Sequence, residues 1–135
     1  ESSRVGDVSL PKALWHQMAT AQMVELQTDH PTRLTLLKAD YPHLMRPDSA
    51  TLAKLITGMN ARHGYEITNG WQDALAAEDY DQLVTSLLCE HYDPAYEKAS
   101  ARHSRIARGI VTLSSPDKGA FDACAAEVIG LLDKA

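Results

Sequence analysis

A chain of 135 residues is long enough for one domain with a buried core, and 44% hydrophobic with 23% charged residues is ordinary for a soluble globular protein. The formal net charge of −5 argues against a protein that coats nucleic acid indiscriminately, and the apolar runs are too short to span a membrane. With two cysteines, Cys89 and Cys124, and no secretory signal pattern, we expect a cytoplasmic protein whose thiols are reduced and buried.

The first third of the chain predicts short helices around one strand. Residues 11–19 have proline at the first helical position, and MVELQ at residues 23–27 alternates apolar and polar side chains. Asp29 or His30 then caps a helix that ends before Pro42, because the residue before a proline avoids helical geometry.

Three further helices are predicted in the middle of the chain. Asp48 caps one that closes at Gly64, Thr68 caps the second, and Asp79 opens the third. The third has the clearest pattern, since its apolar residues recur at the spacing of one helix face. That face consists of Tyr80, Leu83, Val84, Leu87, Leu88 and His91.

The last part of the chain predicts one strand and one helix. GIVTL at residues 109–113 is rich in β-formers, and Ser115-Pro116-Asp117 provides a cap, a proline and an acidic residue at a helix start. The predicted buried stripe of this last helix consists of Phe121, Cys124, Ala125, Val128, Leu131 and Leu132.

The order of these elements indicates a predominantly helical α/β fold. Two short strands so far apart are not expected to make a sheet alone, so we interpret them as part of a larger sheet whose other strands lie outside this chain. A helical insertion over about residues 47–107 separates them. The start at Glu1, without an initiator methionine, also indicates a fragment of a longer protein, unless a tag or leader was removed.

The charge distribution changes abruptly near residue 97. Eight acidic residues and no lysine or arginine lie in residues 66–97, whereas four basic residues and no acidic residue lie in residues 98–108. The basic run is interpreted as a helix that contacts phosphates, and the alternative is a solvated helix face near an acidic segment.

HYDPAY, residues 91–96, marks this junction. Asp93 before Pro94 predicts a corner, at which the Asp93 carboxylate caps the next helix. Tyr92 and Tyr96 either pack this corner or bind a ligand, and His91 is interpreted as a residue at the core edge. The spacing of histidines and cysteines predicts no metal site, and the chain contains no glycine-rich phosphate loop.

HYDPAY, with the preceding LV and LL pairs, closely resembles a segment near the C-terminus of bacterial tRNA 2-selenouridine synthases. The opening ESSRVGDVSLP, the strand with VEL and the helix RLTLLKADY resemble other segments of that family in the same order. The resemblance covers essentially the whole chain, and HYDPAY is its most specific part.

The resemblance implies an enzyme that joins a rhodanese-like domain to a P-loop domain. Members of the family exchange the sulfur of wobble 2-thiouridine in tRNA for selenium from selenophosphate, and the sulfur can first be geranylated from geranyl diphosphate. This chain is similar to the C-terminal part of the P-loop domain. The rhodanese cysteine and the phosphate-loop lysine are therefore expected upstream, so that this chain alone is inactive and holds no cofactor.

The resemblance also implies a set of binding residues, although it leaves the catalytic residues unknown. Tyr92 and Tyr96 are expected to stack on the wobble base, and Arg102 and Arg105 to contact tRNA phosphates. His91 and Asp93 are included as part of HYDPAY. The residues expected to bind tRNA or substrate are Arg4, Arg33, His91, Tyr92, Asp93, Tyr96, Arg102 and Arg105.

Arg4 and Arg33 are the candidates for binding a diphosphate or selenophosphate. Where the family usually has arginine in its opening motif, this chain has Ser3, followed by Arg4. Arg33 has a structural alternative, since its long side chain can extend along its own helix.

A different class of function is also compatible with the sequence. In this alternative the chain is a non-catalytic helical module that binds a protein partner through its acidic residues 66–97. A small nucleotide kinase is disfavoured, because the phosphate loop that such an enzyme requires is absent from these residues.

Overall fold

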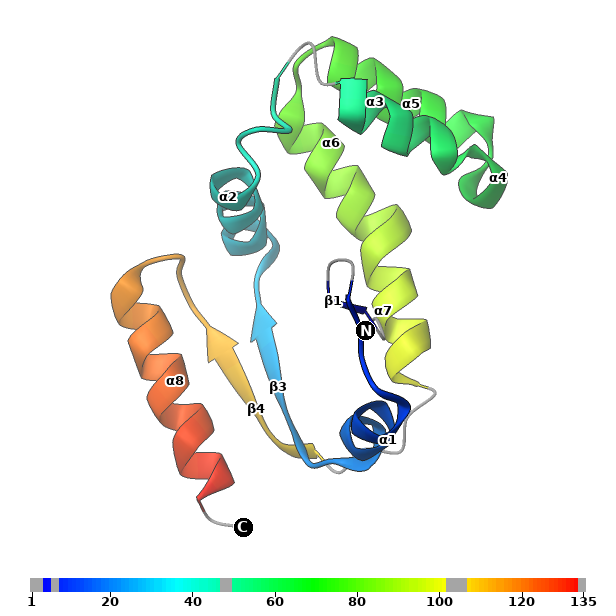
Figure 1. The fold of residues 1–135 in the computed structure, drawn as a ribbon. Coiled ribbons are helices and arrows are strands. Elements are labelled where there is room, and N and C mark those ends of the chain that lie inside the picture. Colours follow the sequence, from blue (N-terminus) through cyan, green and yellow to red (C-terminus); the bar gives the residue numbers. More distant parts are fainter. Residues whose placement is uncertain (1–3, 6–7, 47–49, 102–106, 134–135) are drawn as a thin grey trace. The chain divides into compact units, whose positions relative to one another are not determined.

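The computed structural model describes residues 4–5, 8–46, 50–101 and 107–133 (Figure 1). These residues are predominantly helical and include two parallel strands, in agreement with the predicted predominantly helical α/β class. The chain divides into two compact units, one of residues 1–29 with 94–135 and one of residues 30–93. The second unit begins and ends earlier than the predicted insertion. In the described ranges no helix is long and apolar enough to cross a membrane.

The first unit contains the strands and the C-terminal helix. Its elements are β1 (Arg4–Val5), β2 (Val8–Ser9), α1 (Lys12–Thr20), β3 (Met23–Thr28), β4 (Ala107–Leu113), α8 (Lys118–Leu132) and most of α7 (Asp93–Ser100). The strands β1 and β2 form a short antiparallel ladder in which Arg4 lies opposite Ser9.

The strands β3 and β4 lie where the sequence predicts strands, and they pair with each other in parallel. In the described residues they make a two-stranded sheet, contrary to the expectation that two strands so far apart would not make a sheet alone. That further strands lie outside this chain stays a prediction. Long crossovers are the usual connection of parallel neighbours, and here the second unit provides one.

Helix α8 packs along β4 (Figure 1). Val111 and Leu113 are buried, and the Cys124 Sγ donates to the Thr112 carbonyl at 3.4 Å. Gly109 permits the close approach of Leu131, because a Cβ at residue 109 would lie 2.9 Å from a methyl carbon of that leucine.

Helix α8 begins two residues later than predicted. Asp117, rather than Ser115, is the N-cap, and its carboxylate accepts from the Ala120 N–H at 2.9 Å. The predicted buried stripe is also only partly buried, since Cys124 is buried whereas Phe121 and Leu132 are exposed. A two-stranded sheet is too narrow to cover the whole apolar face of a helix of this length.

The regular elements described in the second unit are all helices. Its elements are α2 (His30–Asp40), α3 (Ala50–Gly58), α4 (Asn60–His63), α5 (Tyr65–Ala76), α6 (Tyr80–Leu87) and η1 (Leu88–Tyr92). Helices α3, α5 and α6 enclose its core (Figure 1). The buried residues of this core are Leu52, Ile56, Trp71, Ala74, Leu75 and Leu83.

Two helix boundaries in this unit differ from the predictions. The single helix expected up to Gly64 is divided at Met59 into α3 and α4, and the proposed cap, Asp48, lies outside the described residues. Gly64 does end α4, with a positive φ of 80° that glycine adopts without strain.

Thr68 is not a helix cap, because α5 begins three residues earlier, at Tyr65. The Thr68 side chain is buried inside the helix, and its hydroxyl donates to the Gly64 carbonyl at 2.9 Å. The hydroxyl bonds back to the preceding turn, a pattern that threonine adopts within helices as well as at their ends. By contrast, the cap predicted at Asp79 is confirmed, since its carboxylate accepts from the Gln82 N–H at 3.0 Å.

Candidate functional site

The HYDPAY stretch lies in a continuous helical segment instead of at a corner. Its first two residues end the π turn η1, and Asp93 begins α7 with helical angles of φ −61° and ψ −47°. The Asp93 N–H donates to the Leu88 carbonyl, five residues earlier. The predicted corner at Asp93-Pro94 and the capping role of Asp93 are therefore wrong.

The π turn explains how a proline follows without ending the helix. In a regular α-helix the ring of Pro94 would clash with the carbonyl four residues earlier, and its missing N–H would leave that carbonyl unpaired. A turn with hydrogen bonds to the fifth preceding residue changes the local register and relieves this conflict. Such turns are frequent at functional sites, which makes η1 the centre of the candidate site.

Three polar side chains at this turn each contact a different helix of the second unit. They are Glu90, His91 and Asp93, and their partners lie on α5, α4 and α2. The Glu90 Oε2 accepts from Trp71 Nε1 at 2.8 Å, the His91 Nδ1 lies 2.7 Å from His63 Nε2, and Asp93 pairs with Arg33. The turn is therefore fixed by side chains as well as by its backbone.

Arg33 and Asp93 form a bidentate ion pair, although they lie 60 residues apart. The two guanidinium nitrogens donate to the two carboxylate oxygens at 2.9 and 2.6 Å, the strongest arrangement for this pair of groups. These hydrogen bonds lower the pKa of Asp93 against the opposing effect of desolvation, and they raise the pKa of Arg33. Arg33 thus binds a carboxylate of its own chain, whereas the sequence predicted that it binds a diphosphate or selenophosphate.

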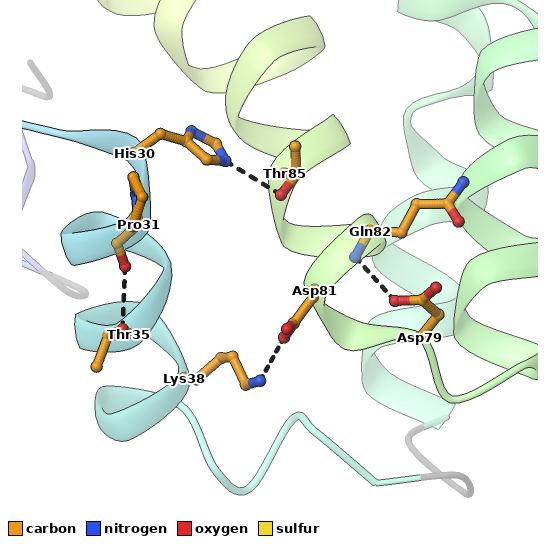
Figure 2. Close-up of polar contacts among 8 residues, drawn as sticks. All are labelled: His30, Pro31, Thr35, Lys38, Asp79, Asp81, Gln82 and Thr85. Atoms are coloured by element: carbon orange, nitrogen blue, oxygen red, sulfur yellow. Dashed lines mark hydrogen bonds and ion pairs between the residues drawn. The ribbon is translucent and has the colours of Figure 1, made fainter.

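Helix α2 is placed against α6 by two further polar contacts (Figure 2). The His30 Nε2 lies 3.0 Å from the Thr85 hydroxyl, and Lys38 forms an ion pair with Asp81. Figure 2 also shows the Asp79 cap at the start of α6, which sets where this helix begins. Arg33 lies on α2 between His30 and Lys38, so these contacts hold it beside the π turn.

His91 belongs to a cluster of aromatic rings rather than to a simple core edge. Its ring centroid lies 4.9 Å from that of His63 and 4.8 Å from that of Tyr92, and the rings are nearly perpendicular in both pairs. The ring of Trp71 lies 5.2 Å from that of His63. Desolvation, followed by the nearby His63 and Arg62, lowers the pKa of His91.

The two tyrosines of HYDPAY are both exposed. Tyr92 is 43% exposed in the second unit, and Tyr96 is 56% exposed in the first. Neither ring is part of the buried core, and the Tyr92 ring contacts that of His91 with centroids 4.8 Å apart. Each ring is accessible to a ligand from solvent.

The remaining predicted binding residues lie in the first unit or outside the described residues. Arg4 lies in the short strand β1 of the first unit, while Arg102, Arg105 and Ser3 lie outside the described residues. The prediction of a basic helix over residues 98–108 is wrong at both ends of this range, where the structure describes the chain. Helix α7 ends at Ser100, and residue 108 belongs to β4.

Arg108 lies at an irregularity in the β3–β4 pairing, where β4 has one residue more than β3. An extra residue of this kind has no partner on the opposite strand, so its side chain can be directed away from the β3–β4 ladder. The Arg108 Nε donates to the Gln22 Oε1 at 2.7 Å. Arg108 therefore has a structural contact that the charge pattern alone did not predict.

A groove between α5 and the α6–η1 segment was not predicted from the sequence. Its volume is about 280 Å³, and its lining includes Glu66, Gly70, Trp71, Gln82, Ser86 and Glu90. Two of these side chains are carboxylates, and none is basic. The spacing of residues 82, 86 and 90 at every fourth position was the sequence signal that could have indicated a shared helix face.

Cys89 is exposed, contrary to the prediction that both thiols are buried, while Cys124 is buried as predicted. Cys89 follows Leu88 in the π turn, where the widened backbone rotates successive side chains away from the regular α-helical pattern. Within the part of the chain that the structure describes, no group of three or more histidine, cysteine, aspartate or glutamate side chains could hold a metal ion.

Comparisons of the chain with protein-family models, with curated proteins and with solved structures found no match.

Proposed function

We propose that this chain is the C-terminal part of a P-loop domain in a cytoplasmic tRNA-modifying transferase. The enzyme would replace the sulfur of wobble 2-thiouridine with selenium from selenophosphate, by way of a geranylated intermediate formed from geranyl diphosphate. The rhodanese-like domain and the phosphate loop would belong to upstream segments of the same protein. In this proposal the chain contributes binding of tRNA and substrate.

The observation that carries the proposal is the Arg33–Asp93 ion pair. Arg33 begins the RLTLLKADY segment and Asp93 is the centre of HYDPAY, so the pair joins two of the segments on which the family resemblance depends. The direct contact places two segments that lie far apart in the sequence at one location in the fold. In the proposed site Arg33 is a positioning residue, because both oxygens of Asp93 already occupy its guanidinium.

The exposed tyrosines support a role in binding an unpaired base. Aromatic side chains that stack on splayed bases are the usual means by which proteins bind single-stranded RNA loops such as the anticodon. Tyr92 follows His91 in the fixed π turn, which limits the freedom that its ring would lose on stacking. Arg4, Arg102 and Arg105 remain the proposed contacts with phosphate groups.

The proposed tRNA contact predicts a salt-dependent affinity that the double substitution Arg102→Ala/Arg105→Ala weakens. Each lost phosphate contact should reduce the slope of log affinity against log salt by about 1, so the double variant should lose about 2. The measurement is tRNA binding by fluorescence anisotropy over a salt series, with Lys12→Ala/Lys54→Ala as a control of equal charge change. Equal slopes for the two double variants would refute the contact.

The chemistry is tested on the full-length protein that contains this chain. Incubation with tRNA bearing wobble 2-thiouridine, selenophosphate and geranyl diphosphate should yield 2-selenouridine, which mass spectrometry of the digested nucleosides detects. Tyr92→Leu should lower the yield at limiting tRNA more than at saturating tRNA, because stacking contributes to binding. A full-length protein that leaves 2-thiouridine unchanged would overturn the proposed function.

The acidic groove favours a second candidate function, a non-catalytic module that binds a basic segment of a protein partner. The groove carries Glu66 and Glu90, and it lies within the stretch of residues 66–97 that lacks lysine and arginine. Complementary charge gives such interfaces specificity and a fast, salt-dependent association. This function predicts that the unmodified protein and both double variants of the salt series do not bind tRNA. It also predicts that Glu66→Gln/Glu90→Gln weakens binding of the partner.

A further inference from the structure

The contact between His63 and His91 depends on how many protons the two rings carry. His63 is the last residue of α4 and His91 lies in η1, and their facing nitrogens are 2.7 Å apart. A hydrogen bond between two imidazoles requires one nitrogen that donates and one that accepts. The contact is therefore compatible with two neutral rings, or with one neutral and one protonated ring.

A second added proton makes the contact impossible. Both facing nitrogens would then be donors, and two positive rings would lie with centroids 4.9 Å apart. Arg62 on α4 is a second positive group that acts on His91, beside the protonated His63. The nearest carboxylate in sequence, Glu90, accepts from the Trp71 N–H on α5 and so already has a partner.

We propose that the His63–His91 contact is a proton-operated latch on the π turn, closed while the pair carries at most one added proton and open when both rings are protonated. His91 is one of the three side chains that connect the turn to other helices of the second unit. Opening the latch releases the turn from α4 and leaves it connected through Glu90 and Asp93. The inference rests on this geometry and does not depend on the proposed tRNA chemistry.

The direction of the pH effect follows from the lowered pKa of His91. In the unfolded chain this ring binds a proton near its ordinary value of 6.5, whereas in the folded chain it does so only at lower pH. The unfolded state therefore binds more protons in this window, and stability falls as the pH falls below 6.5. Above that pH the latch contributes its full effect.

The first test is performed on the unmodified chain by NMR. The ring of His91 should take up its proton only below the ordinary pKa of 6.5, and the NMR signals of the His63 ring should change over the same step, because the two facing nitrogens share one contact. Amide protection factors of residues 88–93 should fall by about tenfold or more between pH 7 and pH 5. Independent single-step titration of both rings, with unchanged protection, would overturn the latch.

The second test separates the pair from other titrating groups. His63→Gln places an uncharged amide near the position of Nε2, so the contact can remain while the second charge cannot form. We expect this variant to lose most of the pH-dependent fall in protection at residues 88–93. His43→Gln, which removes an exposed histidine outside the pair, should keep it.

Two outcomes of the second test would contradict the proposal. One is a pH dependence in His63→Gln equal to that of His43→Gln, and the other is a pH dependence lost equally in both variants. If His63→Gln fails to fold, His91→Asn, which places an amide near the position of Nδ1, takes its place. The NMR titration of the unmodified chain tests the latch whether or not these variants fold.

Discussion

Replacing Trp71 with alanine is expected to lower the free energy of unfolding by about 3–5 kcal/mol, the range for truncating a large buried aromatic residue. Trp71 is 1% exposed and packs in the same core as Ile56 and Leu83. The substitution leaves a cavity in the core of the second unit. It also removes the indole N–H, which donates a hydrogen bond to the Glu90 carboxylate. Urea unfolding followed by far-UV circular dichroism measures the loss.

Two further variants assign the origin of this loss. Tyr65→Ala removes an aromatic side chain from the same helix at a position that is 72% exposed, and it should change stability by no more than about 0.5 kcal/mol. Trp71→Phe retains most of the buried ring and should cost less than Trp71→Ala. Similar losses for Tyr65→Ala and Trp71→Ala would contradict the assignment of Trp71 to the core.

Replacing Arg33 with methionine is expected to lower the free energy of unfolding by about 1–2 kcal/mol, because it leaves the Asp93 carboxylate without its bidentate partner. The value is reduced from that of a buried pair, since about a third of each side chain is exposed. Lys38→Met breaks a more exposed ion pair on the same helix, and it should cost at most about 0.5 kcal/mol.

The same ion pair predicts a pH dependence of stability. Because Arg33 lowers the pKa of Asp93 below its ordinary value of 3.8, the pair contributes fully above that pH. Its contribution is lost as the pH falls through the lower pKa of the folded state. The stability difference between the unmodified chain and Asp93→Asn should therefore be constant near neutral pH and should shrink in acid. A difference that grows below pH 3.8 would show that the pair is not formed.

The local signals in the sequence predicted where most elements lie. The strand predicted over residues 23–27 is found within β3, and that over residues 109–113 within β4. Asp79 caps α6, and Gly64 ends α4 with a positive φ. These features depend on side-chain alternation, on a carboxylate beside free N–H groups and on the flexibility of glycine, all of which act within a few residues.

Local rules failed where a distant partner changed the preferred conformation. The rule for a residue before proline predicted a corner at Asp93, yet this residue is helical and its carboxylate binds Arg33 on α2. Thr68 has the side chain of a cap, but the core contacts of α5 extend that helix in front of it. In both places tertiary packing outweighs a local preference of about 1 kcal/mol.

The sequence by itself determined the helical α/β class and most element positions, and it identified HYDPAY as an unusual junction of charge and aromatic residues. Only the tertiary structure decided what these residues contact. The partners of Glu90, His91 and Asp93 lie on three other helices, 19, 28 and 60 residues away. Such pairs form only after the core has brought the helices together, because no local interaction along the chain specifies which distant side chains will meet.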